Sequence, residues 1–110
     1  MRPEIGSLMK HFYNDLENHR IVETDRNRIR GVDKSLFFID HNHEETVVDD
    51  GYSKRNEYEG DYLIELASYL LKQGYKTNQI TILVMYAGQR QYIWRAMKDR
   101  QLLHGIRIMV

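Results

Sequence analysis

The residues best suited to bind a ligand follow an apolar run in the second half of the chain. Ile80–Met85 is almost entirely aliphatic, and Tyr86-Ala-Gly interrupts the run before Gln89. This run has the length of a strand buried on both faces of a parallel sheet, and helical spacing begins at Gln89. Ligands of open α/β proteins gather outside the carboxyl ends of such strands, so Tyr86 to Arg90 is a candidate site. The alternative is that Tyr86 only packs at the strand end and Gln89 only opens the helix.

A second polar group of residues comprises Ser53, Asn56 and Glu59. Asn56 is a strong N-cap candidate, and Glu59 can return a hydrogen bond to the backbone N–H of Asn56, as in a capping box. Ser53 is the alternative cap if the helix begins one turn earlier. The apolar residues that follow form one stripe, and Gly74 supplies the end of the helix. The stripe consists of Tyr62, Leu63, Leu66, Ala67, Leu70 and Leu71.

His41 and His43 lie two positions apart beside several carboxylates, and imidazole with carboxylate is a ligand set that zinc accepts. Their spacing fits no closed zinc site. We therefore favour a flexible acidic loop that runs through Asp50 over a metal site.

Three apolar segments predict a parallel sheet: Leu36–Ile39, Ile80–Met85 and Ile106–Met109. The helix that begins at Asn56 has the pattern of a right-handed crossover between the first two strands. A further helix from Gln89 precedes the third strand. The predicted fold class is α/β, with a parallel sheet flanked by helices.

The N-terminal part of the chain predicts one helix and one polar segment. Pro3–Leu16 begins with proline in the first turn and carries apolar residues at three- and four-residue steps, as in a core helix. His19–Gly31 is rich in arginine, which suits phosphate contacts. Glu23 and Asp25 are interleaved with these arginines, so a solvated loop is the preferred interpretation.

The composition bounds the protein class. The 110 residues fit one domain, and 16 basic and 16 acidic residues cancel, so no global field attracts nucleic acid or an anionic membrane. There is no cysteine, which excludes disulfides and thiolate zinc sites and indicates an intracellular protein. The start of the chain lacks the apolar region of a signal peptide, and no apolar run is long enough to span a bilayer.

Three blocks of the sequence resemble motifs of one helicase family. Met1-Arg-Pro-Glu resembles the end of its Gln-Tyr/His-Arg-Met-x-Pro-Glu motif, and Ser53-x-x-Asn56-x-x-Glu59 matches its Ser-x-x-Asn-x-x-Glu helix opening. Ile80-x-Ile-Leu-Val-Met-Tyr86-x-x-Gln89 resembles its Ile-x-Val-Ile-Thr-Pro-Tyr-x-x-Gln motif. In order and spacing they cover almost the whole chain. The sequence is thus similar to the second RecA-like domain of Upf-type superfamily 1 helicases, especially the NFX-type zinc-finger helicases.

The resemblance implies a partial RecA-like sheet, with residues 1–110 as the N-terminal part of the second RecA-like domain, incomplete at both ends. It implies ATP-driven translocation on, or unwinding of, RNA or DNA. Single-stranded RNA or DNA and the missing first RecA-like lobe would be the partners, and no membrane would be involved. ATP and Mg²⁺ would be bound mainly by the missing lobe.

The resemblance also assigns roles to individual residues. Tyr86, Gln89, Ser53 and Asn56 would contact the nucleic-acid strand. Hydroxyls, amides and helix N-termini suit sequence-independent contacts with phosphates, and aromatic rings can stack on bases. Glu59 and Arg2 would lie at the ATP cleft.

Departures from the family pattern limit these implications. Val84-Met85 replaces the usual Thr-Pro, so the hydroxyl expected to contact the strand is absent. The Walker A loop, the Mg²⁺-binding carboxylates and the arginine finger have no counterpart in the sequence, and phosphoryl transfer depends on those charges. The parent protein would be an ATP-dependent helicase, whereas this chain alone is predicted to be inactive. The alternative function is a standalone α/β protein-interaction module, derived from a helicase lobe and without catalysis.

Overall fold

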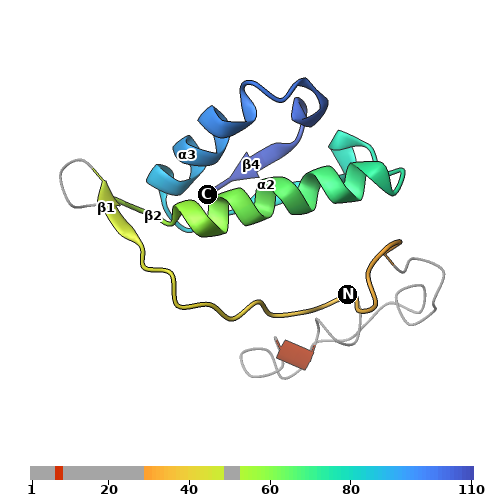
Figure 1. The fold of residues 1–110 in the computed structure, drawn as a ribbon, viewed down its shortest axis with the longest axis horizontal. Helices are drawn as coiled ribbons and strands as arrows, with labels where there is room; N and C mark the ends of the chain where they lie inside the picture. The colour runs from red at the N-terminus through yellow and green to blue at the C-terminus, as the bar shows by residue number, and fades with distance from the viewer. Residues whose placement is uncertain (1–6, 9–28, 49–52) are drawn as a thin grey trace. The chain divides into compact units, whose positions relative to one another are not determined.

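The computed structural model describes residues 7–8, 29–48 and 53–110 of the chain. The chain divides into two units, Met1–Asp40 and His41–Val110, which are considered separately. Figure 1 shows the helices and strands of the second unit, with α2 and α3 beside each other and β4 behind them.

The first unit contains no strand among residues 7–8 and 29–40. The buried strand predicted at Leu36–Ile39 is therefore wrong: Phe37 is 46% exposed and Phe38 is 91% exposed. An apolar run becomes a strand only when a neighbouring segment pairs with its backbone, and no such pairing forms here. Of the predicted helix at Pro3–Leu16, only Ser7 and Leu8 are described, and both are helical. Most of the basic segment His19–Gly31 also lies outside the described residues.

The second unit begins with a short hairpin. Strand β1 (Thr46–Val48) pairs antiparallel with β2 (Ser53–Arg55), and Val47 lies opposite Lys54. The prediction of an acidic loop through Asp50 is thus wrong for Thr46–Val48. These three β-branched residues favour extended backbone, and pairing with β2 outweighs the acidic residues around them.

Helix α2 (Glu57–Lys72) follows the hairpin, with Asn56 as its N-cap, as predicted. Its buried residues are Gly60, Ile64 and Ala67, and Leu63 and Leu71 pack against the core. The predicted stripe is therefore confirmed in part, since it contained Leu63, Ala67 and Leu71 but not Gly60 or Ile64. Tyr62, which was predicted to lie in the stripe, is 38% exposed. The helix ends where predicted, because Gly74 adopts a φ of 100°, which glycine accepts without strain.

A parallel strand pair forms the sheet beside the two helices. Strand β3 (Thr81–Leu83) pairs with β4 (Arg107–Met109), and Ile82 lies opposite Ile108. Helix α3 (Ala87–Met97) connects the two strands and starts two residues before the predicted position. Two short 3₁₀ helices, η3 (Thr77–Gln79) and η4 (Gln101–Leu103), precede β3 and β4. The α/β class is confirmed, and the parallel pair is consistent with a partial RecA-like fold.

The core lies between the sheet and the two helices. Ile93 of α3 and Leu103 of η4 have exposed fractions of 0% and 1%, and they are the largest fully buried side chains among the described residues. Ile64 and Ala67 of α2 and Ile82 of β3 pack in the same cluster. This small core fixes the two helix N-termini beside the carboxyl end of β3. None of the helices in the described part of the chain is long and apolar enough to cross a membrane.

Candidate functional site

Two polar groups of residues, 33 positions apart in the sequence, meet at the N-termini of α2 and α3. The backbone N–H of Asn56 donates to Gln89 Oε1 at 2.7 Å, and Gln89 Nε2 donates to the carbonyl oxygen of Asn56 at 2.9 Å. Asn56 is 8% exposed and Gln89 is 7% exposed. The side-chain amide of Gln89 therefore pairs with the backbone of Asn56 in the way that a neighbouring strand would.

Ser53 makes a second connection between the same parts of the fold. Its Oγ accepts a hydrogen bond from the N–H of Gly88 at 2.7 Å, so β2 satisfies one of the free N–H groups at the start of α3. The N-cap of α3, Tyr86, makes no such side-chain hydrogen bond. A Cβ at position 88 would lie 2.9 Å from Ser53 Oγ and 3.0 Å from the carbonyl oxygen of Lys54, which explains the glycine. Ser53, Asn56, Gly88 and Gln89 are called the polar network below.

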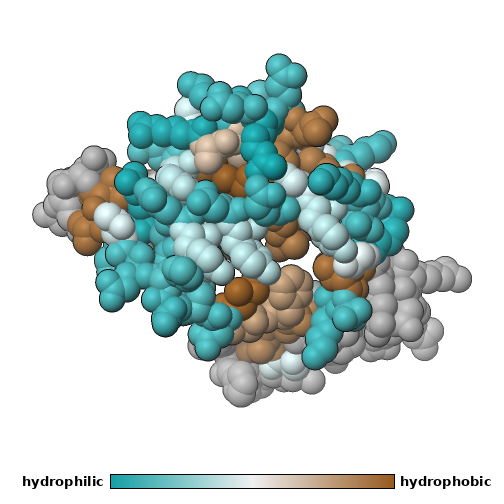
Figure 2. All heavy atoms as spheres, viewed as in Figure 1, coloured by the Kyte–Doolittle hydropathy of each residue, from teal (hydrophilic) through white to brown (hydrophobic). Residues whose placement is uncertain are grey.

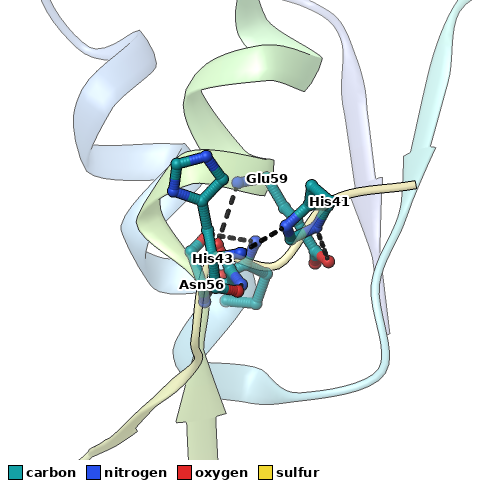
Figure 3. Close-up of polar contacts among 5 residues, drawn as sticks. His41, His43, Asn56 and Glu59 are labelled. Atoms are coloured by element: carbon teal, nitrogen blue, oxygen red, sulfur yellow. Dashed lines mark hydrogen bonds and ion pairs between the residues drawn. The ribbon is translucent and has the colours of Figure 1, made fainter. Parts of the chain in front are cut away.

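Asn56 also caps α2, as predicted from the sequence. Asn56 Oδ1 accepts from the N–H of Glu59 at 3.1 Å, and Asn56 Nδ2 donates to the carbonyl oxygen of His43 at 2.8 Å. The reciprocal half of the predicted capping box is wrong, because Gln89 occupies the Asn56 N–H and the carboxylate of Glu59 faces His41 (Figure 3). Ser53 is not the cap of α2 either.

The two histidines hold the segment before β1 against α2. His41 Nε2 lies 2.7 Å from Glu59 Oε1, and His41 Nδ1 accepts from the N–H of His43 at 3.1 Å. Because Nδ1 is an acceptor, the ring proton belongs on Nε2, which donates to Glu59. The His43 ring stacks on Tyr58 with a centroid distance of 3.7 Å. Nothing in the sequence pattern indicated this stacking.

The described residues contain no cluster of three metal-ligating side chains around these histidines or elsewhere. The histidines act instead as hydrogen-bonding and stacking groups. Glu59, whose side chain is 53% exposed, is therefore engaged by His41 within the chain.

Four of the predicted site residues line one hollow of about 340 Å³ at the carboxyl end of β3: Asn56, Glu59, Tyr86 and Gln89. Tyr86 is 37% exposed, and the ammonium of Lys54 lies 6.0 Å from the centre of its ring. Glu45, bound to Lys54 at 2.7 Å, raises the pKa of that ammonium through a hydrogen bond. The hollow thus presents an aromatic ring and the Lys54–Glu45 ion pair beside the hydrogen-bonded amides of Asn56 and Gln89.

Val84 occupies the position where the helicase motif usually carries threonine. Its side chain is 9% exposed and belongs to the core cluster, and its N–H donates to the carbonyl oxygen of Met109 at 2.9 Å. The next residue, Met85, is 86% exposed. Val84 also contributes to the wall of the hollow, so a hydroxyl at this position would lie at its apolar base.

The described residues show no site for Mg²⁺ and ATP. The described part of the chain has no metal-ligand cluster, and the sequence has no glycine-rich phosphate loop with its lysine. Arg2, predicted at the ATP cleft, lies outside the described residues.

Comparisons with known proteins identify relatives across the whole chain. A family model described as "AAA domain" matches residues 1–109. NFX1-type zinc finger-containing protein 1 of Mus musculus is 41% identical over 111 aligned positions, which cover 100% of this chain and 6% of that protein. The protein named Helicase required for RNAi-mediated heterochromatin assembly 1, from Schizosaccharomyces pombe, is 33% identical over 101 positions, 90% of this chain and 10% of its own length.

A more distant relative has the same extent. Regulator of nonsense transcripts 1 homolog of Drosophila melanogaster is 27% identical over 111 positions, which cover 96% of this chain and 9% of that protein. The chain therefore spans about a tenth or less of the curated relatives it matches.

Proposed function

This chain belongs to the AAA-domain family of superfamily 1, NFX-type helicases, and from that premise we propose that it forms the nucleic-acid-facing part of a helicase motor. In this proposal, residues 1–110 are the N-terminal part of the second RecA-like domain. The ligand is single-stranded RNA or DNA, the partner is the first RecA-like lobe, and the motor acts inside the cell.

The observation that carries the proposal is the hollow at the carboxyl end of β3. Binding sites of α/β sheets lie at this end of the strands. Here the N-termini of α2 and α3 approach the same place, and Tyr86 offers a ring beside Lys54, a cation that is paired with Glu45 within the chain. An aromatic ring, a cation and helix N-termini form a sequence-independent binding surface for a single strand.

Within the proposed site the polar residues have different tasks. Tyr86 contacts the strand directly, because it lines the hollow and is 37% exposed. Ser53, Asn56 and Gln89 hold the two helix N-termini in register, since Gln89 pairs with the backbone of Asn56 and Ser53 accepts from the N–H of Gly88. Of these three residues, Asn56 and Gln89 line the hollow.

The ATP side of the proposal rests on Glu59 and Arg2. ATP and Mg²⁺ would be held mainly by the first lobe, since this chain lacks the charges that bind a triphosphate. When bound there, they supply the free energy of phosphoryl transfer. Glu59 would face that cleft with its exposed oxygen, while its contact with His41 keeps the N-terminus of α2 in place.

A chimeric helicase tests the proposed function. This chain would replace the 101 aligned positions in the Schizosaccharomyces pombe helicase, and ATP hydrolysis would be measured against the concentration of single-stranded RNA and DNA. We expect stimulation by a single strand. Tyr86→Ala should lower the stimulated rate by roughly tenfold, because one stacked base contributes about 1–3 kcal/mol.

The matched control is Tyr62→Ala, which removes a tyrosine of similar exposure from the outer side of α2. This variant should leave the stimulated rate unchanged. A chimera that folds and binds ATP but shows no response to nucleic acid, or responds equally with Tyr86→Ala, would contradict the proposal. Such a result would support the interaction module without catalysis.

A further inference from the structure

The outward face of α3 exposes the single tryptophan of the chain. Trp94 is 56% exposed, although burial of the large indole ring usually stabilises a fold by removing much apolar surface from water. Arg90, Gln91 and Lys98 are also exposed and lie one turn before or after Trp94 on the same side of α3. Arg90, Gln91, Trp94 and Lys98 are called the Trp94 face below.

The charge of this face has one sign. From Ala87 to Lys98 the chain contains Arg90, Arg95 and Lys98 and no acidic residue. The ammonium of Lys98 lies 4.9 Å from the centre of the Trp94 ring, so a cation already sits against the indole. The first turn of α2, by contrast, carries Glu57 and Glu59. A chain with no net charge thus has a locally positive surface around its tryptophan.

The Trp94 face borders a hollow whose lining combines apolar and polar residues. It has a volume of about 470 Å³ and is lined by Val48, Ser53, Ala87, Gly88, Arg90, Gln91 and Trp94. Hydrophilic side chains cover much of the region of α3 on the face shown in Figure 2. The hollow lies beside the start of α3, one turn away from Tyr86.

We propose that the Trp94 face is a second base-stacking subsite for single-stranded nucleic acid, separate from the hollow that contains Tyr86. The indole stacks on one base, while Arg90 and Lys98 neutralise the phosphates on either side of it. Stacking on aromatic rings together with cationic contacts to the backbone is the general mode of sequence-independent single-strand binding. The inference rests on the proposed function only in taking a single strand as the ligand.

An acidic peptide is the competing occupant of a positive surface. A single strand fits better because the exposed feature is a large flat ring with the ammonium of Lys98 against it, and a peptide carboxylate does not stack on an aromatic ring. The two ligands are distinguished by experiment.

Binding at Trp94 can be followed by its own indole fluorescence, since no other residue of the chain is a tryptophan. The full chain would be titrated with an oligothymidylate and an oligouridylate of about 12 nucleotides, long enough to cover one binding surface, while indole fluorescence and the anisotropy of a 5′ dye are recorded. We expect the oligonucleotide to quench the indole. Trp94→Ala should raise the Kd by roughly tenfold or more.

Two further variants separate stacking from charge. Arg90→Gln should lower the slope of log K against log salt by about 0.7, as expected for the loss of one contact with a single-strand phosphate. Tyr62→Ala on α2 is the control for the loss of an exposed aromatic ring and should leave the Kd unchanged. Far-ultraviolet circular dichroism confirms that each variant is folded.

Several outcomes would overturn the inference. They are an unquenched indole, equal affinity in Trp94→Ala, or quenching of similar strength by a polyglutamate peptide of matched length. The failure of the proposed function is recognised separately, because it is judged by ATP hydrolysis of the chimera and the response to Tyr86→Ala. If Tyr86→Ala lowers the stimulated rate while Trp94→Ala binds as well as the wild type, only the second subsite is refuted.

Discussion

The polar network and the Trp94 face adjoin at the start of α3, where Gln89 precedes Arg90, but use their polar groups in opposite ways. In the network, Gln89 is 7% exposed and both atoms of its amide bind the backbone of Asn56. On the Trp94 face, Arg90 and Lys98 point to solvent around a ring that is 56% exposed. One region holds the fold together, and the other has groups free for a ligand.

This difference teaches that a motif residue and a ligand-binding residue need not be the same. Ser53, Asn56 and Gln89 carry the resemblance to the helicase motifs, yet their side chains are occupied within the chain. Substitutions there should change stability first and ligand binding second. Substitutions on the Trp94 face should do the reverse.

Gln89→Ala should have the largest effect on stability. The change removes both hydrogen bonds and leaves the buried N–H of Asn56 without a partner, whereas the carbonyl oxygen of Asn56 still accepts from the N–H of Gly60. We therefore expect a loss of about 2–3 kcal/mol in the free energy of unfolding. Urea unfolding followed by circular dichroism measures it. Gln91→Ala removes the same side chain from an exposed position two residues later and should change stability by less than about 0.5 kcal/mol. Equal stability of the two variants would refute the structural role of the network.

The general architecture could be predicted from the sequence because its signals are local. The apolar run at Ile80–Met85, the cap at Asn56 and the stop at Gly74 each depend on a few neighbouring residues. The hydrogen bonds of Gln89 and Ser53 could not be predicted, because they join segments about 33–35 residues apart and depend on how α3 meets β2.

Two errors show where local signals were insufficient. Leu36–Ile39 has the composition of a buried strand, but a strand needs a paired neighbour, which composition does not reveal. Thr46–Val48 was predicted as a loop because acidic residues surround it, although its residues pair with β2. On α2 the prediction was partly confirmed: Leu63, Ala67 and Leu71 lie at the core, whereas Tyr62 is 38% exposed.

Val84→Thr should have an intermediate effect. The substitution restores the residue of the helicase motif, but the hydroxyl enters the edge of the core, where the valine side chain is 9% exposed. We expect a loss of about 1 kcal/mol, because Val and Thr have similar shape and only Thr must desolvate a hydroxyl. Thermal unfolding would show it. A gain in stability would indicate that the hydroxyl finds a hydrogen-bond acceptor in the hollow.

Tyr92→Phe should have the smallest effect and depends on pH. The Tyr92 hydroxyl donates to Asp61 Oδ1 at 2.7 Å, and this hydrogen bond raises the pKa of the phenol to about 12. Because the folded pKa exceeds the unfolded value of about 10, the contribution is complete below pH 10 and is lost as the pH rises toward 12. As the contact is exposed, it should contribute only about 0.5–1 kcal/mol.

The pH series compares wild type and Tyr92→Phe by urea unfolding at about pH 9 and about pH 11.5, on either side of the expected window. The stability difference between the two proteins should shrink at the higher pH. A constant difference would show that the Asp61 contact does not stabilise the folded chain. Together with a large effect of Gln89→Ala, it would show that this exposed hydrogen bond contributes much less to stability than the buried hydrogen bonds of the polar network.

The central claim is that the polar network is structural and that exposed residues around the start of α3 receive the nucleic acid. Titration of the isotopically labelled chain with an oligothymidylate, followed by two-dimensional NMR, tests both parts at once. The account predicts that the indole N–H of Trp94 and the backbone amides of Tyr86 and Arg90 shift, while the side-chain amide of Gln89 keeps its resonance position. Shifts of the Gln89 amide with an unchanged Trp94 indole would contradict it.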